Sequence, residues 1–187
     1  MIIEMIVKIG KDNSFIEQHP NLNFLFEVRY MFRVMIQVGL SSMVFLFSTV
    51  VAWYEGSNIL QDSREWKYTA ILSQWLNGGI ANQSDILLPD YYIYAAKFFP
   101  TFPILMLLSA THLVILIGYI LFKRNQKGFA GFLSFIGITF LGISGLVANS
   151  PTHGLQTFFN LFFIIGLLLI VAALASAFRN GAKEAYR

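Results

Sequence analysis

The chain contains no cysteine, and only 12% of its 187 residues are charged. The lack of cysteine excludes disulfides, thiolate metal sites and cysteine nucleophiles. A soluble domain carries about 25% charged residues, whereas 56% of this chain is hydrophobic. The apolar residues fall in long runs, which favours a multi-span membrane protein over a large soluble core.

Signatures of catalysis are also absent from the sequence. It has no nucleophile elbow, Walker loop, HExxH zinc motif or paired-carboxylate signature. The acidic residues and His153 follow no spacing known for divalent-cation ligands. The net charge of +3 does not indicate nucleic acid, because the basic residues flank the apolar runs as topology signals. We therefore expect no enzymatic activity, no cofactor or metal, and no nucleic-acid partner.

Four apolar runs are long enough to cross a membrane as helices. The clearest, residues 101–122, has no charge and extends about 33 Å at the rise of an α-helix, against a hydrocarbon core of about 30 Å. The predicted spans are residues 35–54, 101–122, 128–148 and 155–178. The predicted fold class is all-α, an integral membrane four-helix bundle formed by residues 31–187 after a cytoplasmic lead-in of residues 1–30. Met31 and Met35 leave open whether that lead-in belongs to the natural start.

The positions of the basic residues predict the orientation of the spans. Ten of the 13 Lys and Arg residues lie before the first span, in the 123–127 turn or after the fourth span. Lys and Arg next to span ends stay in the cytoplasm. We therefore expect both termini inside, residues 55–90 outside as an external loop, and a multi-pass location in the cell membrane.

The external loop carries a short amphipathic pattern. Asp62 and Glu65 have the spacing of a capping box, and Asn77-Gly78-Gly79 predicts a helix end. Between them, one helical face is apolar: Tyr68, Ile71, Leu72, Trp75 and Leu76. We expect a lid helix that packs by this face on the bilayer surface or on the bundle; the alternative is a partner- or ligand-binding surface.

Later residues predict further details of packing. Asp90 is expected to cap the next helix, Pro100 and Pro103 to kink it, and Lys97 to reach the outer interface. In the third span, small and polar residues share one face, which predicts close helix packing. These residues are Gly131, Ser134, Gly142, Gly145 and Asn149.

His112 is the ionisable residue near the centre of a predicted span, where such a group is a functional candidate by default. Ser109 and Tyr119 share its helix face, so the three form a candidate intramembrane polar site. A haem held by two histidines needs a second histidine at this depth, and a proton relay needs carboxylates within the spans; the sequence supplies neither. We therefore expect a neutral histidine that is hydrogen-bonded to a Ser or Thr of the first span.

Residues 33–127 resemble a family of small bacterial multi-pass membrane proteins known only as a domain of unknown function. The resemblance is carried by VGLSSMVFLFSTVVAWYEGS (38–57), EWKYTAILSQW (65–75), YAAKFFPTFPILMLLSA (94–110) and LIGYILFKRN (116–125). It implies a membrane location and no known activity, so no functional residue is implied. Four spans with a long first loop also resemble claudin-type tetraspans, but the cysteine pair of that family is missing.

Together these features favour a non-enzymatic accessory or interaction subunit. Its partners would be the lipid bilayer and either another membrane protein or a second copy of itself, and the aromatic-rich external loop would be the contact surface. The alternative is a small oligomeric transporter or channel with His112 facing the bundle interior.

Overall fold

The computed structural model describes residues 20–185 except residue 124, with side chains from residue 28 to residue 178. Most of the predicted lead-in, residues 1–30, therefore lies outside the described residues. Within them the secondary structure is helical without a strand, so the predicted all-α class is confirmed. The chain divides into two compact units, residues 1–40 and 41–187.

The helix α3, with which the described residues begin, runs from Pro20 to Gly56. Proline suits a first helical position, because its missing N–H would have no partner within the helix there. The 37 residues of α3 extend about 55 Å, which is longer than the predicted span of residues 35–54. Residues 20–40 are the described part of the first unit, and all other elements belong to the second.

Among the residues that the structure describes, four helices are long and apolar enough to cross a membrane, and they coincide with the four predicted spans. Two of them are α7 (Thr101–Leu121) and α8 (Gln126–Val147). The candidate span of α3 covers Val28–Leu60, which extends past the end of the helix into the next four residues. In α9 (His153–Ala185) the candidate span is His153–Phe178. At most 22% of the most apolar window of each helix is buried. Most of these apolar side chains therefore face outward, where lipid would solvate them better than water.

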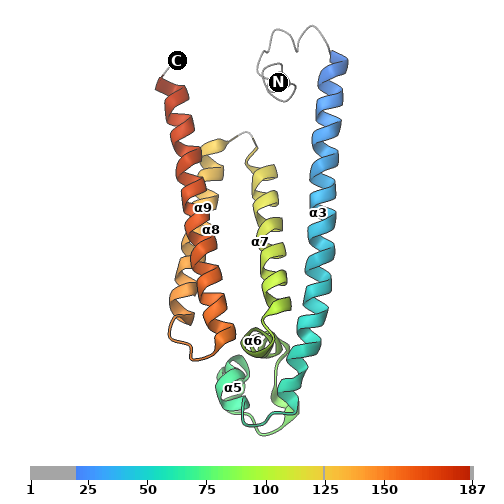
Figure 1. Cartoon of the computed structure of the whole chain (residues 1–187), viewed down its shortest axis with the longest axis vertical. Helices are drawn as coiled ribbons and strands as arrows, with labels where there is room; N and C mark the ends of the chain where they lie inside the picture. Colours follow the sequence, from blue (N-terminus) through green and yellow to red (C-terminus); the bar gives the residue numbers. More distant parts are fainter. Residues whose placement is uncertain (1–19, 124, 186–187) are drawn as a thin grey trace. The chain divides into compact units, whose positions relative to one another are not determined.

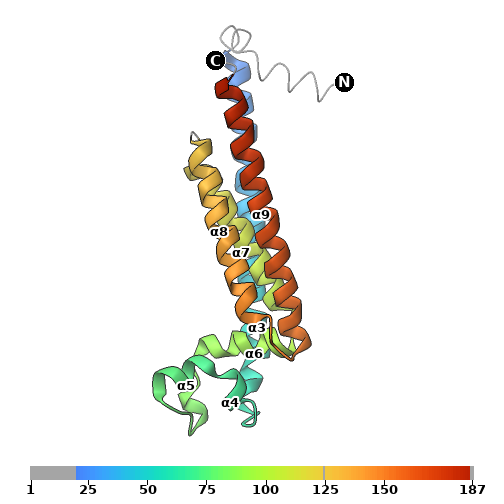
Figure 2. The ribbon, with the colours of Figure 1, turned by 90° about the vertical axis from the view of Figure 1, so that its left-hand side faces the viewer.

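α6 (Leu88–Phe98) precedes α7 as a separate helix. The sequence predicts a kink at Pro100 and Pro103, and the structure has a full break, with Phe99 outside the helical conformation. Pro103 lies in the first turn of α7, where a missing N–H costs no hydrogen bond. α6 is seen end-on in Figure 1, whereas α7, α8 and α9 run along the vertical, so α6 lies across the ends of these helices (Figures 1 and 2).

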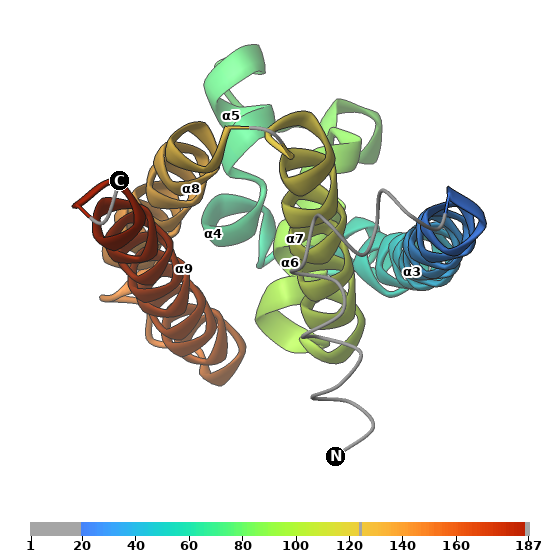
Figure 3. The same cartoon turned by 90° about the horizontal axis from the view of Figure 1, so that it is seen from above.

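α8 and α9 lie side by side along their lengths (Figure 3). Leu133 of α8 packs with Leu169 and Ala173 of α9 in a buried cluster, and Gly137 lets the two backbones approach.

The predicted small-residue stripe is not at this contact. Gly131, Gly142 and Gly145 have open space where a Cβ atom would point. The prediction was wrong because α8 has small residues on two faces, and Gly137 lies on the other one.

Within the second unit, the part of α3 from residue 41 onward meets α7 at isolated positions. Phe47 and Phe102 contact each other edge to face, with ring centroids 6.0 Å apart, and Ser41 contacts His112. α7 and α8 approach each other closely at Gly118, because a Cβ atom there would overlap the ring of Phe132 on α8. Close packing of all four helices as a bundle stays a prediction.

The predicted external loop is a folded segment, residues 57–99, with its own small core. Its elements are η1 (Ser57–Leu60), α4 (Trp66–Thr69), α5 (Ile71–Asn77), η2 (Gln83–Asp85) and α6. The core residues are Ile59, Ala70, Ile86 and Tyr94. Gly78 ends α5 in the left-handed conformation, with φ of 71°, as the Asn77-Gly78-Gly79 pattern predicts. The single lid helix does not form, because the chain breaks at Ala70 between α4 and α5.

Candidate functional site

Asp90 is the buried centre of the folded segment. Its side chain is fully buried, and its carboxylate accepts hydrogen bonds from the N–H groups of Leu72 (3.1 Å) and Ser73 (2.8 Å) and from the Ser73 hydroxyl. Ser73 Oγ in turn accepts from the N–H of Leu87 at 2.8 Å. The sequence predicts that Asp90 caps its own helix. It caps α5 instead, because the first N–H groups of that helix have no partner within it and favour a negative charge.

A second polar cluster joins α4 to α6. Lys97 forms an ion pair with Glu65, and its Nζ lies 3.2 Å from Thr69 Oγ1. The Thr69 hydroxyl donates to Glu65 Oε2 at 2.9 Å. Burial alone raises the pKa of Glu65. The hydrogen bonds from Lys97 and Thr69 and the charges of Lys97 and Arg64 lower it by more than burial raises it. The pKa of Glu65 therefore lies below its usual value of 4.5.

The capping box predicted for Asp62 and Glu65 does not form at α4. Glu65 is the residue before α4, and its side chain makes no capping hydrogen bond to that helix. The carboxylate is engaged by Lys97 instead. Lys97, predicted to reach toward the bilayer interface, turns its ammonium into the folded segment.

The amphipathic pattern of α4 and α5 is inverted relative to the prediction. The small residues Thr69, Ala70 and Ser73 are fully buried. The predicted packing face is exposed: Tyr68 66%, Ile71 57%, Leu72 37%, Trp75 79% and Leu76 61%. The apolar face therefore does not pack on the other described residues, because the hydrogen bonds to Asp90 and Glu65 turn the opposite face inward. A lid that rests by this face on the bilayer surface stays a prediction.

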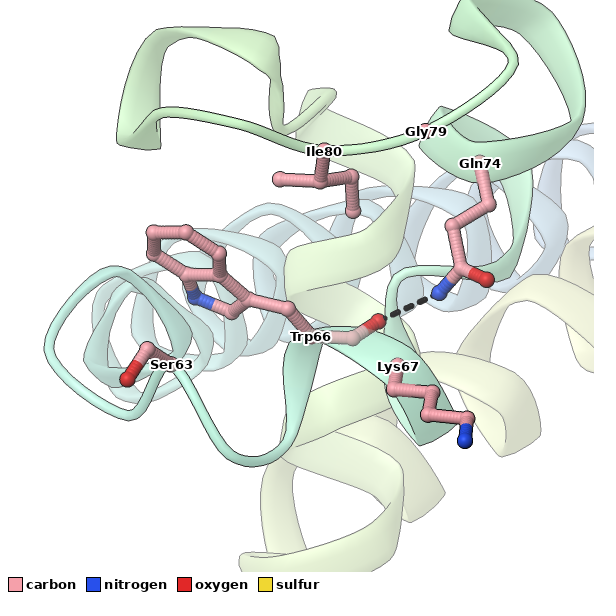
Figure 4. Close-up of a pocket in the computed structure, with 6 residues that line it drawn as sticks. All are labelled: Ser63, Trp66, Lys67, Gln74, Gly79 and Ile80. Carbon is pink, nitrogen blue, oxygen red and sulfur yellow. Dashed lines mark hydrogen bonds between the residues drawn. The ribbon is translucent and has the colours of Figure 1, made fainter.

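A pocket of about 280 Å³ lies between α4 and the loop after α5 (Figure 4). Trp66 and Ile80 face each other across it, whereas the amine of Lys67 points away from the indole ring. The indole N–H donates to the Ile59 carbonyl at 2.7 Å, and the Gln74 amide donates to the Trp66 carbonyl at 2.6 Å. These two donors already form bonds within the segment, and the other polar residues that line the pocket are Ser63 and Lys67.

The predicted intramembrane site is only partly assembled. His112 Nδ1 lies 2.6 Å from the hydroxyl oxygen of Ser41 on α3, so the expected hydrogen bond to a serine of the first span is present. Ser109 is buried and donates to the carbonyls of Leu105 and Met106 on its own helix. Tyr119 packs its ring edge to face against Phe129 of α8, with centroids 5.8 Å apart.

The exposure of the two partners in this hydrogen bond differs. Ser41 is buried, whereas His112 is exposed in the isolated chain. Among the described residues, no three His, Asp or Glu side chains gather closely enough to hold a metal ion. The chemistry that this site supports is therefore hydrogen bonding between helices.

Glu55 is a residue that the sequence did not single out. It lies in the last turn of α3, and its Oε2 is buried without a hydrogen-bond partner in the part of the chain that the structure describes. The neighbouring Gly56 packs so closely on α6 that a Cβ there would lie 2.1 Å from the Tyr91 carbonyl oxygen. The sequence carries no signal of this approach, since it joins segments 35 positions apart.

Comparison with known families matches residues 35–122 to a domain of unknown function, DUF4306. The uncharacterized protein YjdJ of Bacillus subtilis (strain 168) is 42% identical over 78 residues, which are 41% of this chain and 72% of that protein. No solved structure matches the chain significantly. The family match includes the folded segment, Ser41 and His112, and ends before α8 and α9.

Proposed function

The chain belongs to the DUF4306 family, whose function is unknown, and we propose that it is a non-enzymatic interaction subunit of the bacterial cell membrane. In this proposal, four spans hold the chain in the bilayer with both termini inside. The folded segment then lies on the external side, where it contacts another membrane or envelope protein.

Two features support this membrane arrangement. Four helices have the length and apolarity of spans, and the folded segment connects the first of them to the second. Ten of the 13 Lys and Arg residues lie at the opposite span ends or in the terminal regions of the sequence. Such a bias favours a cytoplasmic location of those ends.

The observation that carries the proposal is the exposed apolar face of α4 and α5, which we call the α4–α5 face (Tyr68, Ile71, Leu72, Trp75 and Leu76). Its side chains are 37–79% exposed, and a contiguous apolar patch on a folded surface marks an interaction site. Trp and Tyr are enriched among the residues that dominate binding energy in protein interfaces.

The direction of the α4–α5 face favours a protein partner over the bilayer. Ser73 points toward Asp90 of α6, and at 100° per residue Ile71 and Trp75 lie on the opposite side of α5. α6 lies nearer the ends of α7, α8 and α9 than α5 does (Figures 1 and 2). Ile71 and Trp75 therefore point away from the spans.

The test is recovery of a stoichiometric complex from native membranes in mild detergent. We expect the combined change Ile71→Ser with Trp75→Ser to abolish the complex while the chain stays folded. The matched control is Leu88→Ser, which changes a similarly exposed apolar residue on α6, 58% exposed. A complex that survives the double change, or that is lost equally in the control, would refute the α4–α5 face as the contact surface.

A second candidate function, a small oligomeric transporter or channel, is favoured by one observation. His112 is exposed near the middle of α7 although its Nδ1 contacts Ser41, and an exposed imidazole within a membrane span suits a water-lined path. Purified protein in liposomes should then conduct a solute, and His112→Leu should abolish that flux without unfolding the chain.

A further inference from the structure

A second cavity, of about 300 Å³, lies where three candidate spans come together at their ends. Tyr119 lines it from the last turn of α7, Gln126 and Phe129 from the beginning of α8, and Ser176 from α9. The Tyr119 and Phe129 rings meet nearly at right angles, with an interplanar angle of 76°. The cavity thus combines aromatic walls with hydroxyl and amide groups.

The residues that line this cavity flank the α7–α8 turn. This turn lies at the end of α7 and α8 that is remote from the folded segment (Figure 1). α7 and α8 have 21 and 22 residues, about the length that crosses the hydrocarbon core. Their ends therefore fall at the depth of the polar headgroups. Leu121, 72% exposed, and Leu174, 53% exposed, offer apolar surface nearby on α7 and α9 for acyl chains.

The sequence around the cavity-lining residue Gln126 is basic. Lys123 lies in the α7–α8 turn and Lys127 in the first turn of α8, on either side of Gln126 in the sequence. The chain has no Asp or Glu between Asp90 and Glu184, so basic residues outnumber acidic ones in the α7–α8 turn and the first turn of α8. A lysine near a membrane surface strengthens binding of an anionic lipid about fivefold.

The beginning of α8 adds to this positive character. Gln126 is the first residue of the helix, and the side chain of Asn125 accepts the N–H of Gly128 at 2.9 Å. A helix N-terminus favours a negative group because its first N–H groups point along the helix axis away from the helix. The cavity, the two lysines and the helix end therefore favour the same ligand charge.

We propose that this cavity binds the phosphate headgroup of an anionic phospholipid. The headgroup would contact the polar side chains that line the cavity, those of Tyr119, Gln126 and Ser176. Its negative charge would be offset by Lys123 and Lys127. The acyl chains would lie on the apolar surfaces of α7 and α9. Basic pockets between spans are a recurrent site for such lipids. The inference requires membrane insertion and is independent of the proposed protein contact.

The experiment measures lipid retained by the purified full-length chain in mild detergent, with native mass spectrometry as the readout. Phosphatidylglycerol is the anionic probe and phosphatidylcholine the zwitterionic comparison. We expect one retained phosphatidylglycerol per chain and weak retention of phosphatidylcholine. The double change Lys123→Gln with Lys127→Gln should weaken phosphatidylglycerol retention about 25-fold, or about fivefold for each lysine.

Two controls separate the site from general charge effects. Arg64→Gln with Lys67→Gln removes the same charge from the folded segment and should leave retention unchanged. Gln126→Leu keeps every charge, and it should reduce retention by altering the cavity wall, so the proposal stays testable even where the lysine double variant fails to fold. Helical content by circular dichroism identifies the variants that fold.

Three results would overturn the proposal. The first is equal retention of the two lipids by the unchanged chain. The second is phosphatidylglycerol retention that neither Gln126→Leu nor the lysine double change reduces. The third is complete displacement of the lipid by millimolar inorganic phosphate, which would identify a site for free phosphate instead.

Discussion

Gly137 and Gly166 face each other across the α8–α9 contact so closely that a Cβ atom on either would lie 2.9 Å from the carbonyl oxygen of the other. A Cβ on Gly137 would also lie 2.8 Å from Ile170 Cγ1. Backbones this close make van der Waals contacts with each other in place of contacts with lipid. Small residues permit this close approach. The pair therefore fixes where the two helices meet.

Replacing Gly137 by alanine should destabilise the chain by about 1–3 kcal/mol, the usual cost of overpacking a close contact. Gly131→Ala on the same helix is the matched control, because its Cβ would have nothing within 4 Å. The measurement is the unfolding free energy of the purified protein in detergent. Equal stability of the two variants would show that the glycine contact does not hold the helices.

Asp90→Ala should unfold the segment around α5, because it leaves the buried N–H of Ser73 and the part-buried N–H of Leu72 without an acceptor. A fully buried group without an acceptor costs about 1–3 kcal/mol. Hydrogen exchange at these two amides should accelerate, whereas Asp62→Ala should have little effect, since its pairing with a 93% exposed Arg64 side chain is a surface ion pair. Unchanged exchange in Asp90→Ala would contradict the buried-carboxylate account.

The folded segment should lose stability in acid. The pKa of Glu65 is lower in the folded chain than its usual value of 4.5, so the folded state favours the ionised form. Its contribution is complete above the unfolded pKa and is lost as the pH falls through the folded pKa. Asp85 has a lowered pKa of the same sign, caused by the Asn82 and Ala81 N–H groups.

Comparing the unchanged chain with Glu65→Gln isolates the Glu65 contribution from that of Asp85. Hydrogen exchange of the folded segment, followed from pH 6 to pH 3, should show a stability difference between the two chains that shrinks below pH 4.5. A difference that is constant over this range would mean that the ion pair with Lys97 does not act in solution.

The contact of Ser41 with His112 should be a modest stabilising link between α3 and α7. His112→Leu and Ser41→Ala should each cost about 0.6–2 kcal/mol, the scale of hydrogen bonds between membrane helices. His112→Asn and His112→Gln should retain most of the stability because either can hydrogen-bond across the helices. In the double variant the two losses should not add; additive losses would show that the side chains do not interact.

The spans and the hydrogen-bonding role of His112 could be predicted from the sequence because each depends on local information. A charge-free run such as residues 101–122 has few alternatives to a membrane helix, and a single histidine within it needs a partner wherever it lies. The identity of that partner, Ser41, depends on how α3 meets α7. The sequence placed it only as a Ser or Thr of the first span.

The folded segment could not be predicted, because long-range polar contacts override its local pattern. The periodicity of residues 66–77 favours burial of Trp75 and its neighbours, yet Asp90, 17 positions after Ser73, draws the opposite face inward. The prediction of which face of α8 packs on α9 was wrong for a similar reason. Gly131 and Gly137 are equivalent as residues, and only the position of Gly166 on α9 distinguishes them.

The proposed topology places the folded segment outside and the α7–α8 turn inside, and single-cysteine labelling distinguishes the two sides in this cysteine-free chain. Lys67→Cys in the folded segment should react with a membrane-impermeant maleimide on intact cells. Lys127→Cys at the beginning of α8 should react only after the membrane is permeabilised. Labelling of Lys127→Cys on intact cells, with Lys67→Cys protected until permeabilisation, would contradict the account.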